Sequence, residues 1–252
     1  MATIEFPTLF SPLLGGPMRM KNRIFSSGHD TVMVHDGAVT DQLIAYHRAR
    51  AEGGAGLIIM QVAGIHESAR YTSHVLMVTD DSCIPGYRRL AEVVHEYGCK
   101  LVSQIFHPGR EIMESQDGAL PVALAPSAVP NERFHVMPRA VDVELLHEII
   151  AGYAEGALRL QKAGLDGVEV VASHGYLPAQ FLNPKLNFRT DEYGGSLENR
   201  MRMLRETVAA VRQAVGPDFV VGLRISADER TFDAVDNDDV VALCQTLDRD
   251  GH

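Results

Sequence analysis

Two side chains suited to acid–base chemistry follow one apolar run of the chain. His174 and Tyr176 come directly after residues 167–172, a β-branched stretch typical of a strand buried on both faces. A parallel strand of an α/β barrel delivers such side chains to the catalytic face. A phenol with a pKa of ~10 keeps its proton at neutral pH and can transfer it to a carbanionic carbon. The alternatives are a packed tyrosine whose hydroxyl bonds a backbone carbonyl, and a histidine that only braces its loop.

Two further polar side chains stand in other apolar runs. Arg224 follows the run of residues 219–223, and an arginine at the end of a buried strand needs an anion. Either a ligand or Glu169 of the neighbouring strand can supply that anion, and both can do so at once. Gln104 lies within residues 100–106, where a buried amide needs a partner for its donor and its acceptor. Both positions are therefore candidates for contact with a ligand.

Short β-branched runs alternate with helical patterns along the chain. The expected strands are residues 23–27, 56–62, 100–106, 167–172 and 219–226. Apolar residues recur between them at helical spacing, in the sets Tyr87, Leu90, Ala91 and Val94; Leu146, Ile150, Tyr153 and Ala157; and Leu204, Val208, Val211 and Val215. A last helix is expected over residues 237–249. The alternation predicts a parallel sheet with crossover helices.

One connection is longer than a strand-to-helix loop normally is. Residues 107–141 contain five prolines and a short apolar piece at residues 122–128. We expect an excursion that covers a substrate site and includes a small hairpin. The alternative is a surface loop with no catalytic role.

Residues 174–200 carry a long run of specific polar residues and glycines, from His174-Gly175-Tyr176 to Asn199-Arg200. This run resembles the loop after the fourth strand in the old yellow enzyme family of flavin mononucleotide (FMN) oxidoreductases. The similarity is strongest to the branch that contains 2,4-dienoyl-CoA reductase and trimethylamine dehydrogenase, and it covers nearly the whole chain. The resemblance implies a (β/α)8 TIM barrel with bound FMN.

The chain provides five strand–helix units, whereas a closed barrel of this family has eight. We therefore expect residues 1–252 to be the N-terminal part of an FMN-binding barrel domain, with strands six to eight missing. The family's FMN phosphate site comes from loops after strands seven and eight, so a chain that truly ended at His252 is expected to be inactive. A downstream iron–sulfur cluster and second nucleotide-binding region, as in larger relatives, are left open.

The resemblance also assigns roles to single residues. Tyr176 would protonate the substrate, and His174 would polarise it by donating a hydrogen bond to its oxygen. Gln104 would donate and accept hydrogen bonds at the flavin pyrimidine, and Arg224 would face the N1/O2 edge of the flavin. The end of the first strand would pass the isoalloxazine ring; it comprises Ser27, Gly28 and His29.

Two positions depart from the family pattern. Asp30 stands where trimethylamine dehydrogenase has the thiol that attaches its flavin, so any FMN here is expected to be noncovalent. Val171 replaces the first histidine of many old yellow enzymes, which moves this chain away from the plain enone reductases. Val171 also stands where trimethylamine dehydrogenase has a tyrosine, and this weakens that specific amine-oxidising mechanism.

The resemblance implies an enzyme in which NAD(P)H reduces FMN and the flavin passes hydride to an enone or enoyl thioester. One alternative is oxidation of a methylated amine by the same flavin, and another is a non-catalytic barrel remnant that serves as a scaffold. The sequence leaves open the identity of the substrate, the choice between NADH and NADPH, and the oligomeric state.

Composition restricts the partners and the location. The net charge of −10 argues against nucleic acid or an anionic membrane as a partner. Neither a membrane-spanning run of ~18 apolar residues nor a signal peptide is recognisable, so a cytoplasmic location is expected. The cysteines form no Cys-x-x-Cys pair and the acidic residues no cluster, so we expect no metal site. A small-molecule substrate is the expected partner.

Overall fold

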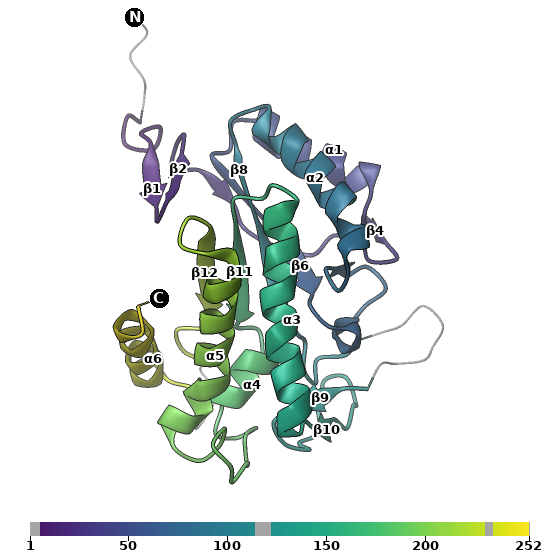
Figure 1. The fold of residues 1–252 in the computed structure, drawn as a ribbon, viewed down its shortest axis with the longest axis vertical. Coiled ribbons are helices and arrows are strands. Elements are labelled where there is room, and N and C mark those ends of the chain that lie inside the picture. Colours follow the sequence, from purple (N-terminus) through teal and green to yellow (C-terminus); the bar gives the residue numbers. More distant parts are fainter. Residues whose placement is uncertain (1–5, 114–121, 230–233, 252) are drawn as a thin grey trace, which may run out of the picture.

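A row of five parallel strands forms the centre of the molecule (Figure 1), which is a computed structural model that describes residues 6–113, 122–229 and 234–251. The order along the row is the order in the chain, as in half of a barrel. The strands are β3 (Phe25–Ser26), β6 (Leu57–Gly64), β8 (Lys100–Phe106), β11 (Gly167–Ala172) and β12 (Val220–Ile225). All five expected strands are confirmed. The first is shorter than expected, because only two of its residues pair with β6.

Side chains alternate between the two faces of these strands, as pleating requires. On β11, Val168 and Val170 point into the main core beneath the helices, whereas Glu169 and Val171 lie on the other face. The same alternation on β8 places Gln104 beside Glu169 in the strand register. One face therefore packs against helices, and the other presents polar groups to the interior of the half-barrel.

Helices cover the outer face of the strands, and α3 and α5 run side by side (Figure 1). Each stripe expected from the sequence is buried, because its apolar residues pack on the strands. The helices are α1 (Asp41–Glu52), α2 (Ile84–His95), α3 (Val143–Lys162), α4 (Leu177–Leu182), α5 (Leu197–Val215) and α6 (Asn237–Arg249), with 3-10 turns η1 (Glu67–Ala69) and η2 (Asp81–Cys83). Within the described ranges, none of them has the length and apolarity needed to cross a membrane.

Smaller strands lie around the central row, with β1 and β2 near the start of β8 and β4 beside α2 (Figure 1). The antiparallel pair β1 (Leu13–Gly15) and β2 (Met18–Met20) seals the end where the strands begin. There Met18 and Met20 pack against Ile59 and Val102. Further small strands are β4 (Val34–His35) with β5 (Ala38–Val39), and β7 (Leu76–Met77), which pairs with the end of β6.

The long connection after β8 pairs with itself in two places. Its piece β9 (Leu124–Ala125) pairs in parallel with β10 (Arg139–Ala140). Between them an antiparallel bridge joins Asn131 and Val136, which is the antiparallel pairing that the described part of this connection offers for the expected small hairpin. Residues 114–121 of the connection lie outside the described residues.

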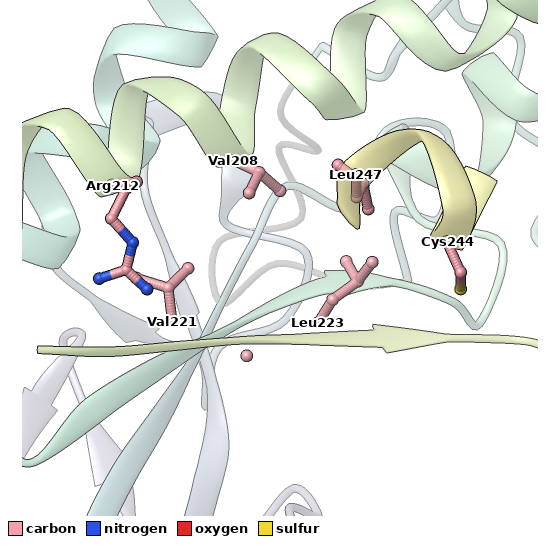
Figure 2. Close-up of a pocket in the computed structure, with 7 residues that line it drawn as sticks. Val208, Arg212, Val221, Leu223, Cys244 and Leu247 are labelled. Carbon is pink, nitrogen blue, oxygen red and sulfur yellow. The ribbon is translucent and has the colours of Figure 1, made fainter. Parts of the chain in front are cut away.

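The row of strands is open at β12. Figure 2 shows Val221 and Leu223 on the helix-facing side of this strand, below Val208 of α5 and Leu247 of α6. These side chains leave a cavity of about 220 Å³ at the edge, next to Cys244. Every residue of β12 is partly exposed, in contrast to the buried β8 and β11. Within the described residues, the outer edge of β12 has no partner strand.

A carboxylate fastens the beginnings of two central strands. Asp166, just before β11, accepts hydrogen bonds from Lys100 Nζ at 2.7 Å, His95 Nε2 at 2.6 Å and the Leu101 backbone N–H at 2.9 Å. Burial alone would raise the pKa of Asp166, but these donors lower it below its ordinary value. The ionised carboxylate therefore stabilises the fold.

We expect Asp166→Asn to lower the free energy of unfolding by about 1–3 kcal/mol at pH 7, since the charge-assisted hydrogen bonds weaken. A depressed folded-state pKa contributes stability above the unfolded pKa of about 4, and this contribution is lost as the pH falls through the folded value. Urea unfolding of both proteins at pH 7 and pH 3 measures the difference, which should shrink at the lower pH. The exposed neighbour Asp218→Asn is the control, and an equal loss in both variants would contradict the account.

Candidate active site

All seven residues expected at the site line one cavity of about 220 Å³ at the C-terminal ends of the strands. The residues that follow β3 line one part of the cavity, and the loop after β11 lines another. Apolar side chains of Val62 and Val171 and the carboxylate of Asp30 complete the lining. The seven expected residues are Ser27, Gly28, His29, Gln104, His174, Tyr176 and Arg224.

A row of polar groups crosses three neighbouring strands at this cavity. Glu169 of β11 accepts a hydrogen bond from Gln104 Nε2 of β8 at 2.8 Å. On its other side it pairs with Arg224 of β12, through Nε at 2.6 Å and Nη2 at 3.3 Å. The ion pair between Arg224 and Glu169, one of the two alternatives for Arg224, is therefore confirmed.

The pairing leaves a donor and an acceptor free. Arg224 Nη1 and Gln104 Oε1 make no hydrogen bond with any described residue. A guanidinium N–H next to an amide that can both donate and accept suits the edge of a ring with alternating carbonyl and N–H groups. The pyrimidine edge of a flavin has this pattern, so the residues present fit an isoalloxazine ring.

Gly28 allows this row to pack against the end of β3. A Cβ atom at position 28 would lie 2.7 Å from the Gln104 side chain and 2.8 Å from the Met60 carbonyl oxygen. Neither distance is tolerable for carbon, so a larger residue would displace Gln104. The next residue, His29, is held by its ring: Nδ1 donates to the Ser27 carbonyl at 3.1 Å, and Nε2 accepts from the Tyr46 hydroxyl.

His174 stands on a loop with an unusual backbone. Its φ of 60° lies in the left-handed region, which costs a side-chain-bearing residue about 1–2 kcal/mol, and Gly175 follows with φ 74°. Ser173 Oγ contacts His174 Nδ1 at 2.7 Å. Burial and then the charge of Arg224 lower the pKa of His174, against an opposing effect of Glu169. The imidazole is therefore neutral at pH 7.

Tyr176 combines a packed ring with a free hydroxyl. The ring packs edge-to-face on Phe106, with centroids 4.9 Å apart, and on Tyr71 at 6.1 Å. The hydroxyl makes no hydrogen bond with any described residue, so the alternative of a phenol bonded to a backbone carbonyl is not found there. Burial, followed by the charges of Asp30 and Glu111, raises the pKa of Tyr176 well above its ordinary value. The phenol therefore stays protonated.

Two carboxyls near Tyr176 were not expected to belong to the site. The sequence marks Asp30 only as a departure from the thiol that attaches the flavin in trimethylamine dehydrogenase. In the structure it lines the cavity, and burial raises its pKa to about 6. Glu111 lies in the long connection, against Gly175. An acid in the loop after the first strand is a signal that sequence reasoning could have used for Asp30. Glu111 offers no such signal, because its position depends on how the long connection folds back.

We expect Gly28→Ala to lower the free energy of unfolding by about 1–3 kcal/mol, since the methyl group overpacks Gln104 and Met60. Urea unfolding measures this loss. Gly222→Ala on β12 is a matched control, because its Cβ would meet nothing closer than 3.6 Å. A Gly28→Ala protein as stable as the Gly222→Ala protein would show that the packing is looser than described.

Comparison with known proteins places the chain among flavin enzymes. A sequence model of the NADH:flavin oxidoreductase / NADH oxidase family matches residues 8–250. The chain is 40% identical to the metal reductase of Desulforamulus reducens, over 96% of this chain and 36% of the relative. It is 37% identical to the N,N-dimethylglycine/sarcosine dehydrogenase of Chromohalobacter salexigens, over 98% of this chain and 36% of the relative. The chain thus spans about a third of the length of these two relatives.

Solved structures agree with the sequence comparison. The structure of morphinone reductase in complex with tetrahydroNAD matches with a TM-score of 0.86 and 32% sequence identity. The match covers 96% of this chain and 71% of that chain. The expected barrel architecture is therefore confirmed for the half that these strands form.

Proposed function

Because the chain belongs to the NADH:flavin oxidoreductase / NADH oxidase family, we propose that it binds FMN noncovalently and uses NAD(P)H to reduce the activated C=C bond of an enone or enoyl thioester. The observation that carries the proposal is the protonated, unbonded hydroxyl of Tyr176 next to a neutral His174 in one cavity. A complex of a similar protein with tetrahydroNAD supports a nicotinamide donor.

The polar row and the end of β3 form the proposed flavin side of the cavity. Gln104 would pair with the pyrimidine edge, and Arg224 would place positive charge beside it, while Glu169 holds both side chains in position. Gly28 lets the backbone approach the ring plane. Bound there, FMN would supply hydride-transfer chemistry between NAD(P)H and the alkene.

His174 and Tyr176 form the proposed substrate side. A neutral imidazole donates a hydrogen bond to the substrate carbonyl oxygen and stabilises the negative charge that develops when hydride reaches the β-carbon. Tyr176 then gives its proton to the α-carbon, and the phenolate recovers a proton from water. Hydride and proton together saturate the double bond.

A second candidate function is oxidation of a methylated amine by the same flavin. It is favoured by the 37% identity to a dimethylglycine/sarcosine dehydrogenase. In this direction a hydride leaves the methyl group of the amine, and the resulting iminium is hydrolysed. The third alternative, a barrel remnant without catalysis, predicts a protein without flavin colour. Visible absorption separates the remnant from both enzymes, and turnover of enones against methylated amines separates the two enzymes.

We expect Tyr176→Phe to keep the ring packing but remove the transferable proton. Flavin reduction by NAD(P)H should be nearly unchanged, whereas reoxidation by an enone or enoyl thioester should slow roughly 10²–10⁴-fold. Stopped-flow absorbance resolves the two half-reactions. Equal slowing of both would indicate a collapsed site, and no slowing of either would assign the proton to another donor.

We expect Arg224→Met to make the flavin midpoint potential more negative and to slow reduction by NAD(P)H, because a cation near the reduced ring is lost. Potentiometric titration measures the shift. Glu169→Gln is the matched control, since it breaks the same ion pair but keeps the cation, and its potential should move in the opposite direction. An unchanged potential in Arg224→Met would limit Arg224 to its pair with Glu169.

A further inference from the structure

A completely buried amide lies next to the loop that carries His174 and Tyr176. It belongs to Gln180 of α4, whose side chain has no contact with solvent. Burying an amide costs free energy unless its two N–H groups and its oxygen find hydrogen-bond partners. The partners of Gln180 therefore show which parts of the chain this side chain holds together.

The amide of Gln180 joins two loops. Its Nε2 donates to the Gly175 carbonyl at 2.6 Å and to the Pro108 carbonyl at 3.1 Å. Its Oε1 accepts from the Arg110 backbone N–H at 3.4 Å. The reverse orientation would bring Oε1 against two carbonyl oxygens, which cannot donate, so the orientation of the amide is fixed. One side chain thus ties the loop after β11 to the turn after β8.

The bond to Gly175 falls between the two residues proposed to act on the substrate. His174 and Gly175 have left-handed backbones, with φ of 60° and 74°. Such a backbone is strained at His174, and it persists only where the surrounding contacts impose it. On the far side of the turn, the Tyr176 N–H donates to the Ser173 carbonyl at 3.1 Å. The bond from Gln180 fixes the peptide in the middle of the turn.

The turn after β8 leaves space for this amide. Gly109 has a φ of 66°, and a Cβ atom at this position would clash with both end atoms of the Gln180 amide. A larger residue there would displace Gln180. The same turn also contacts the substrate loop directly, because the Leu177 N–H donates to the His107 carbonyl at 2.9 Å. Gln180 therefore anchors Gly175 to a part of the chain that is itself bonded to the loop.

We propose that Gln180 is a positioning residue, whose buried amide fixes the Gly175 peptide and thereby the places of the His174 imidazole and the Tyr176 phenol. Gln180 is not among the described residues that line the cavity, so its role is indirect. The inference deepens the proposed function and rests on it, because it concerns the two side chains assigned to the substrate.

The variant Gln180→Met keeps the length of the side chain but removes the amide. In the wild type, burial and then the charge of Arg224 lower the pKa of His174. Release of the loop should move this pKa upward, toward the ordinary value of about 6.5. NMR titration of the His174 imidazole in the full chain measures the shift without flavin or substrate. An unchanged pKa of His174 would overturn the proposal.

A second buried amide provides the matched control. Asn187 is also buried, and its Nδ2 donates to the carbonyls of Phe181 and Tyr193, both at 2.7 Å. Asn187→Leu therefore loses two bonds of the same kind, in the segment after α4. We expect it to lower the free energy of unfolding as Gln180→Met does, but to leave the pKa of His174 unchanged. Equal shifts of this pKa in both variants would reduce Gln180 to a general structural role and overturn the proposal.

The wild type offers a measurement that does not depend on a variant that folds. A buried amide bonded to two carbonyls should exchange its side-chain protons with solvent roughly tenfold or more slowly than an exposed one. Gln42, which is exposed at the start of α1, is the reference within the same protein. Exchange of the Gln180 amide protons at the rate of Gln42 would show that the amide is not held, and would overturn the proposal.

Kinetics of the FMN-loaded protein link the position of the loop to turnover. Gln180→Met should slow reoxidation of the flavin by an enone about 10²-fold, since a small displacement misaligns the donor and the acid. Its affinity for FMN should equal that of the wild type, because Gln104 and Arg224 keep their bonds to Glu169. An unchanged rate of reoxidation would overturn the proposal. If the wild type reduces no alkene, the proposed function fails, whereas the His174 titration still decides whether Gln180 positions the loop.

Discussion

Glu169 is a carboxylate inside a half-barrel, and the polar face of the cavity depends on it. An unpaired charge at that depth would cost several kcal/mol, so the carboxylate is maintained only because Gln104 and Arg224 donate to it from the two adjacent strands. The strand register that places Gln104 next to Glu169 is the same register that buries the alternate residues beneath the helices. Fold and site therefore constrain each other. A shift of the strand register by one residue would bury the polar side chains beneath the helices and turn the apolar side chains toward the cavity.

The substrate side of the cavity is built differently, from a loop under strain. His174 and Gly175 adopt consecutive left-handed conformations, which turn the chain sharply from β11 into α4. Backbone contacts hold this turn: Leu177 N–H donates to the His107 carbonyl, and Tyr176 N–H to that of Ser173. The proposed acid and hydrogen-bond donor thus rest on backbone geometry, whereas the proposed flavin contacts rest on side-chain pairing.

Much of the fold follows from the sequence, because the central strands are buried on both faces. Residues 100–106 and 167–172 form strands with the expected bounds, and the apolar runs that predict them are the runs that the helices cover. The first strand is shorter than the expected residues 23–27, since pairing with β6 ends after two residues. The parallel pairing of β9 with β10 was beyond sequence reasoning, because it joins segments that meet only after the connection folds back on Gly109.

The candidate site, like the fold, could be predicted from the sequence only in part. All seven expected residues line one cavity, since the ends of parallel strands must meet at one edge. The local pattern could not reveal the place of Glu111, because the long connection brings this residue against Gly175 only in the folded chain.

The most direct measurement is a titration of the full chain with FMN and with riboflavin, followed by quenching of flavin fluorescence. The residues assigned to the flavin would contact its isoalloxazine ring, which FMN and riboflavin share, so both flavins are expected to bind. Gln104→Leu should weaken the affinity for both to the same extent. Binding of neither flavin, or an affinity that Gln104→Leu leaves unchanged, would contradict the assignment of this cavity to a flavin.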